Sequence, residues 1–155
     1  RKKMVALRHH HPIIIIDSYW TASGEAFCPA AMGMGFHIGP QGSIEICPPL
    51  SFATNKISDN DYDLYKTINE SPYLRGFQQF VKDRTKGCVI LENPQELVEF
   101  IKGHDAKDYS TRDALKEIGC GKPRTSQHMP GKEIPESYWV YRFLKDNVFF
   151  GMGAM

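Results

Sequence analysis

The residues of this sequence best suited to chemistry are its four cysteines: Cys28, Cys47, Cys88 and Cys120. Each has glycine or proline beside it, in "FCPAA", "ICPPL", "KGCVI" and "IGCGK". Such neighbours open the backbone, so a metal cluster can approach closely and peptide N–H groups can point at sulfur. The residues alone allow three interpretations: reduced structural thiols, a disulfide, or a metal or iron–sulfur site.

The spacing of these cysteines differs from that of the most familiar metal motifs. No two of them lie within eighteen positions of each other, so the close CxxC pairs of zinc fingers and the dense runs of ferredoxins are missing. A cytoplasmic and therefore reducing setting, which we expect for reasons given below, counts against disulfides. A metal or cluster whose ligands come from separate elements is therefore the favoured interpretation.

The composition fits a globular chain of one domain, or one small domain with a tail. Nineteen basic and eighteen acidic side chains leave a net charge of +1, so no overall field attracts nucleic acid or an anionic membrane. No apolar run approaches the roughly 18 residues of a membrane span, and no secretory signal is visible. We therefore expect a cytoplasmic protein with neither nucleic acid nor a membrane as a partner.

Two β elements are predicted near the first cysteines. Residues 12–20, "PIIIIDSYW", read as a strand that is apolar on both faces, as in the interior of a larger sheet. Because this strand has no obvious neighbour, we expect the chain to be the C-terminal part of something longer. The segments "GFHI" and "SIEI" alternate around "GPQG", which predicts a β-hairpin between Cys28 and Cys47.

Capping signals predict helices after the hairpin. Ser58, Ser71 and Asn93 are placed as N-caps, and Pro72 and Pro94 occupy first helical positions. The faces expected to be shared are Tyr62, Tyr65 and Ile68 on the first helix, and Leu74, Phe77 and Val81 on the second.

The helix ends are also predicted from sequence. Gly87 should stop the second helix and Gly103 the third, in which Glu96 can close a capping box. Two more helices are expected within residues 110–121 and 134–147. One strand, one hairpin and about five short helices place the chain in the α+β class.

The arrangement of Cys28, Gly42 and Cys47 resembles a known family. Thirteen residues separate Cys28 from Gly42 and four separate Gly42 from Cys47, as in the opening of the SPASM/twitch domains that follow the barrel of many radical S-adenosylmethionine enzymes. The phrase "HIGPQGSIEICPPLSFA" is similar to the hairpins of that family. The downstream "SPYLRGFQQF" resembles the helix that precedes its next cysteine, here Cys88. The resemblance covers residues 18–91, about half of the chain.

The resemblance implies one auxiliary four-iron four-sulfur cluster, which would position substrate or relay an electron. The implied ligands are three cysteines and a preferred fourth: Cys28, Cys47, Cys88 and Cys120. If only three cysteines ligate, the open iron could take His37, His128, water or substrate, and would act as a Lewis acid or a substrate anchor.

The resemblance also implies a domain organisation. Residues 1–20 would be the last strand or exit segment of a missing N-terminal (β/α) barrel, and residues 21–120 the cluster domain. Residues 121–155 would form a loop, a helix and an aromatic tail packed on that domain.

The sequence departs from the family in two respects. It has no CxxxCxxC motif for the catalytic cluster, and no dense later group of cysteines for a second auxiliary cluster. S-adenosylmethionine and a second four-iron four-sulfur cluster would therefore belong to a missing N-terminal region or to a partner subunit. This chain is not expected to be catalytic alone, and its substrate could be a peptide, a protein or a small molecule.

Two functions of other classes fit the same residues. One is a non-enzymatic binding module with reduced buried thiols, and the other is a zinc-stabilised domain that uses the same cysteines with one histidine. The adjacent His9, His10 and His11 are expected to form a surface patch, because three neighbours cannot all point one way. His37 is expected to be partly buried with a hydrogen-bond partner.

Overall fold

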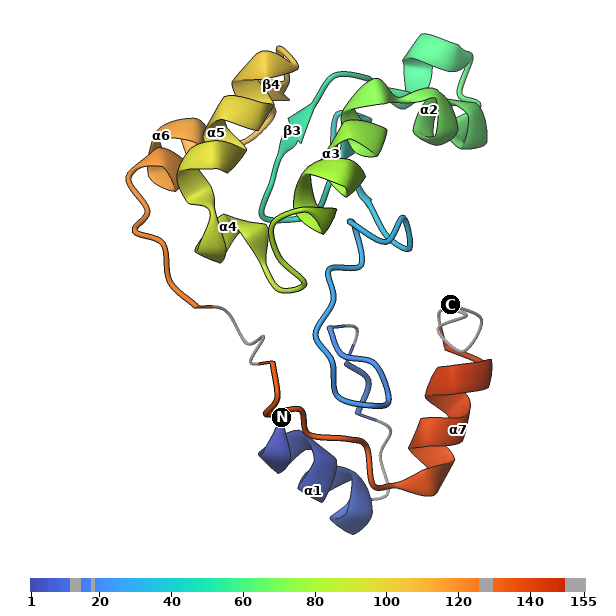
Figure 1. The fold of residues 1–155 in the computed structure, drawn as a ribbon. Helices are drawn as coiled ribbons and strands as arrows, with labels where there is room; N and C mark the ends of the chain where they lie inside the picture. Colours follow the sequence, from blue (N-terminus) through green and yellow to red (C-terminus); the bar gives the residue numbers. More distant parts are fainter. Residues whose placement is uncertain (12–14, 18, 126–129, 150–155) are drawn as a thin grey trace. The chain divides into compact units, whose positions relative to one another are not determined.

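The computed structural model divides into two compact units (Figure 1). The first consists of Arg1–Phe27 with Gln127–Met155, and the second is Cys28–Ser126. The segment predicted to form the cluster domain falls mostly in the second unit. The ranges that the structure describes are 1–11, 15–17, 19–125 and 130–149.

The first unit contains a helix from each end of the chain. The predicted fifth helix is confirmed as α7, Trp139–Asn147, whereas α1, Lys2–His10, was not predicted from sequence. The strand expected at residues 12–20 is not formed in its described part, where Trp20 makes only an isolated bridge to Ala26. Residues 12–14 and 18 lie outside the described residues.

Ion pairs of Asp17, instead of strand pairing, hold the segment that was predicted to form a strand. Its carboxylate accepts hydrogen bonds from Arg1 (Nη1–Oδ2 2.7 Å), Lys145 (Nζ–Oδ1 2.6 Å) and Arg8. Arg8 also binds Glu136, and these buried groups join α1, the Asp17 segment and α7. Burial raises the pKa of Asp17, but the bonds from Lys145 and Arg8 outweigh it and hold that pKa below its usual value.

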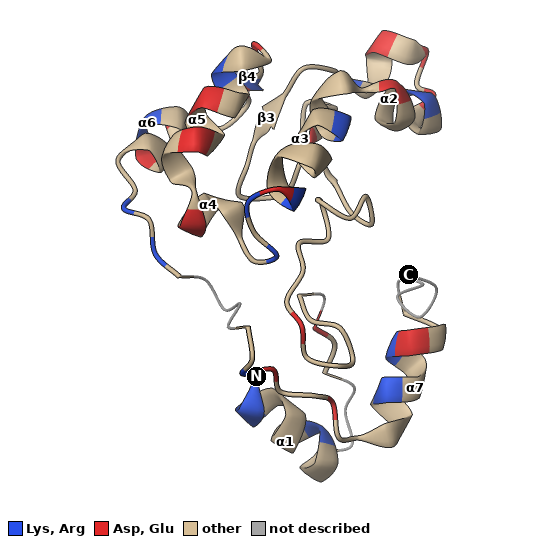
Figure 2. Ribbon diagram, viewed as in Figure 1, with Lys and Arg blue, Asp and Glu red and all other residues tan. Residues whose placement is uncertain are grey.

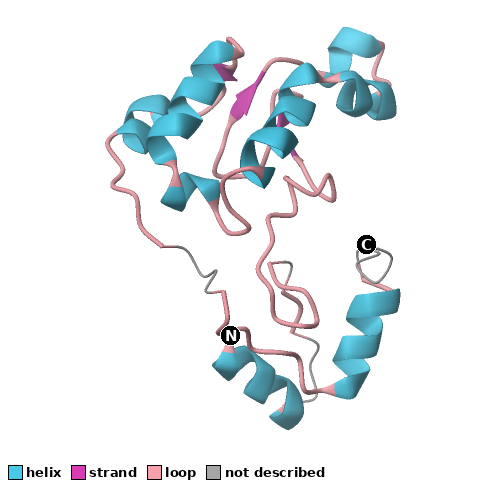
Figure 3. Ribbon diagram, viewed as in Figure 1, coloured by secondary structure: helices cyan, strands magenta, loops and turns pink. Residues whose placement is uncertain are grey.

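The second unit mixes short strands with helices, so the α+β class is confirmed (Figure 3). The predicted hairpin is present: β1, His37–Ile38, pairs antiparallel with β2, Ile44–Glu45. A second pair, β3 Phe52–Ala53 with β4 Lys107–Asp108, was not foreseen. The other elements of this unit are η1 Ile57–Asn60, α2 Leu64–Glu70, α3 Pro72–Lys82, α4 Val89–Glu92, α5 Pro94–Gly103 and α6 Ala114–Gly119.

Helix α3 forms as its sequence predicts, apart from its end. Ser71 Oγ accepts from the N–H of Leu74 at 3.4 Å, and Pro72 opens the helix. The helix ends at Lys82 instead of continuing toward Gly87. Its buried side chains include the predicted stripe of Leu74, Phe77 and Val81.

The capping predictions for α5 and α2 need correction. Helix α5 has the predicted bounds, but Asn93 makes no side-chain cap, and Glu96 binds Arg84 (Oε2–Nε 2.5 Å) instead of closing a capping box. Helix α2 is capped by Asp63, not by Ser58. Asp61 and Tyr62 have positive φ angles of 52° and 65°, which interrupt the expected helix.

The core of the second unit lies between β2, β3 and the helices α3 and α5 (Figure 1). Leu50 and Leu97 are fully buried in it. Two residues of the face predicted for the first helix do not pack in the core, since Tyr62 and Tyr65 are 77% and 80% exposed. Among the described residues, no helix has the length and apolar character needed to cross a membrane.

We predict that Asp17→Asn unfolds the first unit selectively. Removing the carboxylate leaves buried cations without their counter-charge, which costs about 3–5 kcal/mol. Hydrogen exchange should show lost protection in α1 and α7. The matched control is Asp146→Asn, whose ion pair with Arg142 is exposed and 3.9 Å long; it should change stability by less than about 0.5 kcal/mol. Equal effects of the two variants would contradict the prediction.

Candidate metal centre

Three of the four cysteines lie partly buried at the edges of elements in the second unit. Cys28 precedes a turn, Cys47 follows β2, and Cys88 is the N-cap residue of α4. Cys28 and Cys47 pack against the core. The four cysteines are all within the described residues and form no disulfide.

The thiols of Cys28, Cys47 and Cys88 interact electrostatically. Burial raises the pKa of Cys47 to about 12, and negative charge on Cys28 and Cys88 contributes to that rise. Burial also raises the pKa of Cys28, again with a contribution from Cys88. Cys28, Cys47 and Cys88 are the cysteines whose charges enter these pKa shifts, and we call them the thiol group.

Backbone groups in the turns after Cys28 and Cys47 affect the pKa of these two thiols. In the turn Cys28-Pro-Ala-Ala, the backbone at Ala31 and Ala30 lowers the pKa of Cys28, although burial raises it more. In the turn Cys47-Pro-Pro-Leu, the N–H of Leu50 donates to the Cys47 carbonyl oxygen at 2.8 Å, and the backbone at Leu50 lowers the pKa of Cys47 against the effect of burial. That peptide N–H groups point at the sulfur atoms stays a prediction.

Cys120 has a different environment from the thiol group. It is exposed at the C-cap of α6. Its charge is not among the causes of the raised pKa of Cys28 or Cys47. Its role as fourth ligand stays a prediction.

A buried carboxylate lies on the hairpin beside the thiol group. Glu45 is only 2% exposed, and it is the single Lys, Arg, Asp or Glu residue within 28–55, a segment almost entirely tan in Figure 2. Its Oε1 accepts from Ser43 Oγ at 2.6 Å, and its Oε2 lies 2.9 Å from His37 Nδ1. His37 is thus partly buried with a partner, as predicted. Negative charge on Glu45 contributes to the raised pKa of Cys47.

Glycines in the hairpin turn make room for this carboxylate. A Cβ on Gly39 would lie 2.3 Å from both Glu45 Oε1 and Ser43 Oγ, so any side chain there would break that hydrogen bond. Gly42 has a φ of +76°, which L-residues rarely adopt. The turn therefore requires glycine at both positions.

The core of the second unit contains a buried hydroxyl without a partner. Among the described residues, Tyr73 Oη is a buried side-chain oxygen that makes no hydrogen bond. Burial raises the pKa of Tyr73, and negative charge on Cys47 and Glu45 raises it further.

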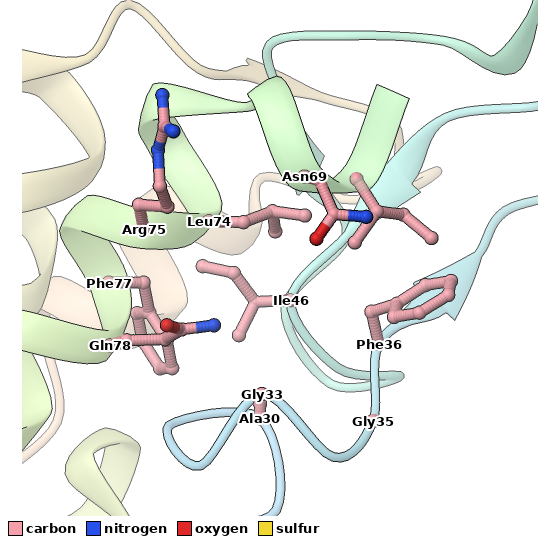
Figure 4. Close-up of a pocket in the computed structure, with 11 residues that line it drawn as sticks. Ala30, Gly33, Gly35, Phe36, Ile46, Asn69, Leu74, Arg75, Phe77 and Gln78 are labelled. Atoms are coloured by element: carbon pink, nitrogen blue, oxygen red, sulfur yellow. The ribbon is translucent and has the colours of Figure 1, made fainter. Parts of the chain in front are cut away.

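A cavity of about 260 Å³ opens next to the turns that carry Cys28 and Cys47 (Figure 4). Its lining includes Ala30, two positions after Cys28, and Ile46, immediately before Cys47. Asn69 and Gln78 turn their side-chain amides toward the space beside Ile46. The cavity is thus apolar at its base, with amide groups at its rim.

The described histidines are not grouped with the cysteines as metal ligands. His9, His10 and His11 are exposed, as predicted, and belong to the first unit. His128 lies outside the described residues. Within the described part of the chain, no three His, Cys, Asp or Glu side chains are grouped so that they could hold a metal ion.

Comparison with known proteins adds no assignment to this geometry. No protein-family model matches the chain, and no curated protein or solved structure was found to be similar to it.

Sequence reasoning singled out the thiols but missed Glu45 and Tyr73. The alternation of "SIEI" does not indicate a buried glutamate. In the structure the strand has only two residues, Ile44 and Glu45, and both are buried. Tyr73 follows Pro72 at the start of α3, where position alone does not indicate which way a side chain points. The signal available in the sequence was that Glu45 is the only charged residue in the long segment 28–55.

We predict slow alkylation of Cys47 in the metal-free protein. At pH 9 a thiol of pKa 9.0 is half ionised, whereas one of pKa about 12 is ionised in roughly one molecule per thousand. The greater nucleophilicity of the high-pKa thiolate recovers roughly 20-fold of this difference, so about a 25-fold slower reaction remains. Peptide mapping after a timed pulse of iodoacetamide measures the rate, with exposed Cys120 as the internal comparison.

The same shift sets a pH dependence. The folded-state pKa of Cys47 lies above its model-peptide value of 9.0, so its contribution to stability is present below about pH 9 and is lost as the pH rises toward about 12. Alkylation of Cys47 as fast as that of Cys120 at pH 9 would contradict this description of the site.

Proposed function

We propose that the second unit holds an auxiliary four-iron four-sulfur cluster on Cys28, Cys47 and Cys88, as the C-terminal domain of a radical S-adenosylmethionine enzyme. The observation that carries the proposal is that Cys28 and Cys47 lie partly buried against the core, with Cys88 partly buried at the start of α4. Negative charge on Cys88 contributes to the raised pKa of both Cys28 and Cys47, which supports the inclusion of the third thiol.

Among the described residues, no His, Cys, Asp or Glu side chains are grouped so that they could hold a metal ion. Metal analysis, and not the spacing of the thiols, therefore decides between a cluster and a single zinc ion.

The chain's own residues would perform three tasks at such a site. Cys28, Cys47 and Cys88 would hold the group as thiolates, and the two turns would keep the sulfur atoms oriented. The core against which Cys28 and Cys47 pack would limit access of water. When bound, a cluster of this kind supplies electron transfer and, at an iron without a protein ligand, Lewis-acid chemistry. The cavity beside Ile46 is the place at which we expect substrate to approach.

The remaining components of the proposal rest on the resemblance to the SPASM/twitch domains. S-adenosylmethionine and a second four-iron four-sulfur cluster would be bound by a barrel domain or partner subunit. Cys120 is the preferred fourth ligand. Because Cys120 is exposed, its binding to the cluster would depend on a movement of the end of α6 or on a contact with substrate.

A binding module with reduced thiols is the second candidate function. It is favoured by the pKa of about 12 at Cys47, which keeps that thiol protonated when nothing binds it. In this case the three cysteines contribute only to packing, and the cavity and its amide rim would contact a partner. The two candidates differ in metal content and in what cysteine substitution does.

We predict about four iron and four sulfide per chain after anaerobic reconstitution, with broad absorbance near 400 nm. Cys28→Ala, Cys47→Ala and Cys88→Ala should each lower the iron content at least several-fold, because each removes a ligand. Iron and sulfide analysis with an absorption spectrum measures the effect. Cys120→Ala tests the fourth position in the same assay: iron lost as in the other three variants would assign Cys120 as the fourth ligand, and iron retained would leave three cysteine ligands.

Three other results would decide against the proposal. One zinc per chain, lost in the same three variants, would indicate the zinc-stabilised domain. A folded chain that takes up neither iron nor zinc would indicate the binding module. Iron that stays at the same level in the Cys28, Cys47 and Cys88 variants would indicate non-specific iron.

A further inference from the structure

The hairpin β1–β2 has an apolar face that is covered along one strand and open along the other. Ile38 on β1 lies directly opposite Ile44 on β2, so the two side chains share a face of the hairpin. Ile44 is 2% exposed within the core, whereas Ile38 is 39% exposed. Phe36, two residues before Ile38 and therefore on the same face, is 40% exposed. The core thus covers the β2 side of this face and leaves the β1 side exposed.

The cavity of about 260 Å³ lies beside this exposed side, since Phe36 and Ile46 both line it (Figure 4). Its other apolar walls come from α2 and α3, through Ile68, Leu74 and Phe77. Pockets that bury drug-sized ligands measure roughly 300–1,000 Å³. This cavity is smaller, so it suits one part of a larger ligand, such as a single bulky apolar side chain.

Two side-chain amides supply an acceptor and a donor at the rim of the cavity. Asn69 on α2 donates through Nδ2 to the carbonyl oxygen of Tyr65 at 2.8 Å, which leaves its Oδ1 on the cavity side. Gln78 on α3 turns its amide nitrogen toward Ile46 (Figure 4), and no described residue pairs with that amide. Each peptide unit carries one N–H and one C=O, so this pair of amides fits the main chain on either side of an inserted side chain.

The outer edge of β1 offers backbone groups to the same ligand. The N–H of Gly39 donates to the carbonyl oxygen of Ser43 at 2.9 Å, and hydrogen-bonded pairs alternate along an antiparallel ladder. His37 and Glu45 are therefore the next hydrogen-bonded pair, and the N–H and C=O of Ile38 point away from β2. No described residue bonds to these two groups of Ile38. Because a free edge of this kind accepts another strand, an extended peptide can add to β1.

The charges around the cavity favour an acidic ligand. Among the described residues that line it, Arg75 is the single charged one. Its guanidinium donates to the main-chain oxygen of Glu70 at 3.4 Å and forms no ion pair with a described side chain. A carboxylate of the ligand, close to the inserted side chain, would supply that pair.

We propose that this cavity and the edge of β1 bind an extended segment of an acidic partner peptide, with one bulky apolar side chain in the cavity. The segment adds to β1 as a third strand. The amides of Asn69 and Gln78 pair with its main chain, and Arg75 pairs with a carboxylate. The inference goes beyond the proposed function, because none of these contacts needs a metal or a cysteine.

The test titrates the full, metal-free chain with N-acetylated pentapeptide amides. These have aspartate at both ends, valine at the second and fourth positions, and leucine or serine at the centre. Nuclear magnetic resonance of the leucine peptide complex should show shifted amide signals of Ile38, Asn69 and Gln78. The serine peptide should bind at least about tenfold more weakly, because the cavity stays unfilled. Lysine in place of both aspartates should weaken binding several-fold.

Two variants of α3 form a matched pair, since Gln78 lines the cavity and its neighbour Gln79 does not. Gln78→Ala should weaken binding of the leucine peptide several-fold at an unchanged melting temperature, because its amide has no partner within the described chain. Gln79→Ala should leave the affinity unchanged. Arg75→Gln should remove the preference for aspartate over lysine in the peptide.

Four results would overturn the inference. The first is the absence of any shift at millimolar peptide, and the second is an equal loss of affinity in Gln78→Ala and Gln79→Ala. N-acetyl-leucine amide that binds as tightly as the pentapeptide would indicate a small-molecule pocket without strand addition. A dimer in sedimentation experiments that Gln78→Ala abolishes would indicate that a second copy of the chain covers this face.

The inference and the proposed function fail separately. A chain that binds the leucine peptide but takes up no iron and sulfide on reconstitution would keep the inference and reject the cluster. A chain that takes up iron and sulfide but binds none of the peptides would keep the cluster and reject the inference.

Discussion

Burial of Cys28 and Cys47 against the apolar core is the constraint on which the candidate site depends. Burial raises the pKa of both thiols, and negative charge on Cys88 raises both further. Thiolates at these positions would therefore be unfavourable without a cation. Backbone groups at Ala31 and Leu50 oppose this penalty only in part. Under the proposed function, a metal centre that accepts the three sulfurs would remove it.

The elements of the unit position the groups of the candidate site. The hairpin β1–β2 carries the buried Glu45, its Gly39 leaves space for that carboxylate, and Cys47 follows β2. Helix α3 carries Tyr73, whose ring is fixed by stacking on Phe100 of α5. Glu45 is the single charged side chain of residues 28–55 (Figure 2). The first unit uses a different device, a buried ion network around Asp17.

Local signals in the sequence predicted the local structure well. Ser71 and Pro72 specify the start of α3 because capping and a fixed φ act within a few residues, and the turn glycines specify the hairpin. Asp63 replaced Ser58 as a cap because backbone conformations at Asp61 and Tyr62 intervene. The pairing of β3 with β4, the burial of Glu45 and the charges around Asp17 depend on residues distant in sequence. The role of Cys28, Cys47 and Cys88 as cluster ligands, implied by the family resemblance, stays a prediction, and the unpaired Tyr73 hydroxyl depends on packing that the sequence does not show.

The central claim is that Cys28, Cys47 and Cys88 bind one cluster in the second unit. The most direct measurement is anomalous diffraction at the iron absorption edge from a crystal of anaerobically reconstituted protein. We predict several iron positions, with the sulfur atoms of these three cysteines bonded to different iron atoms. Three cysteine sulfurs without iron beside them, or a single atom that scatters anomalously at the zinc edge instead, would contradict the account.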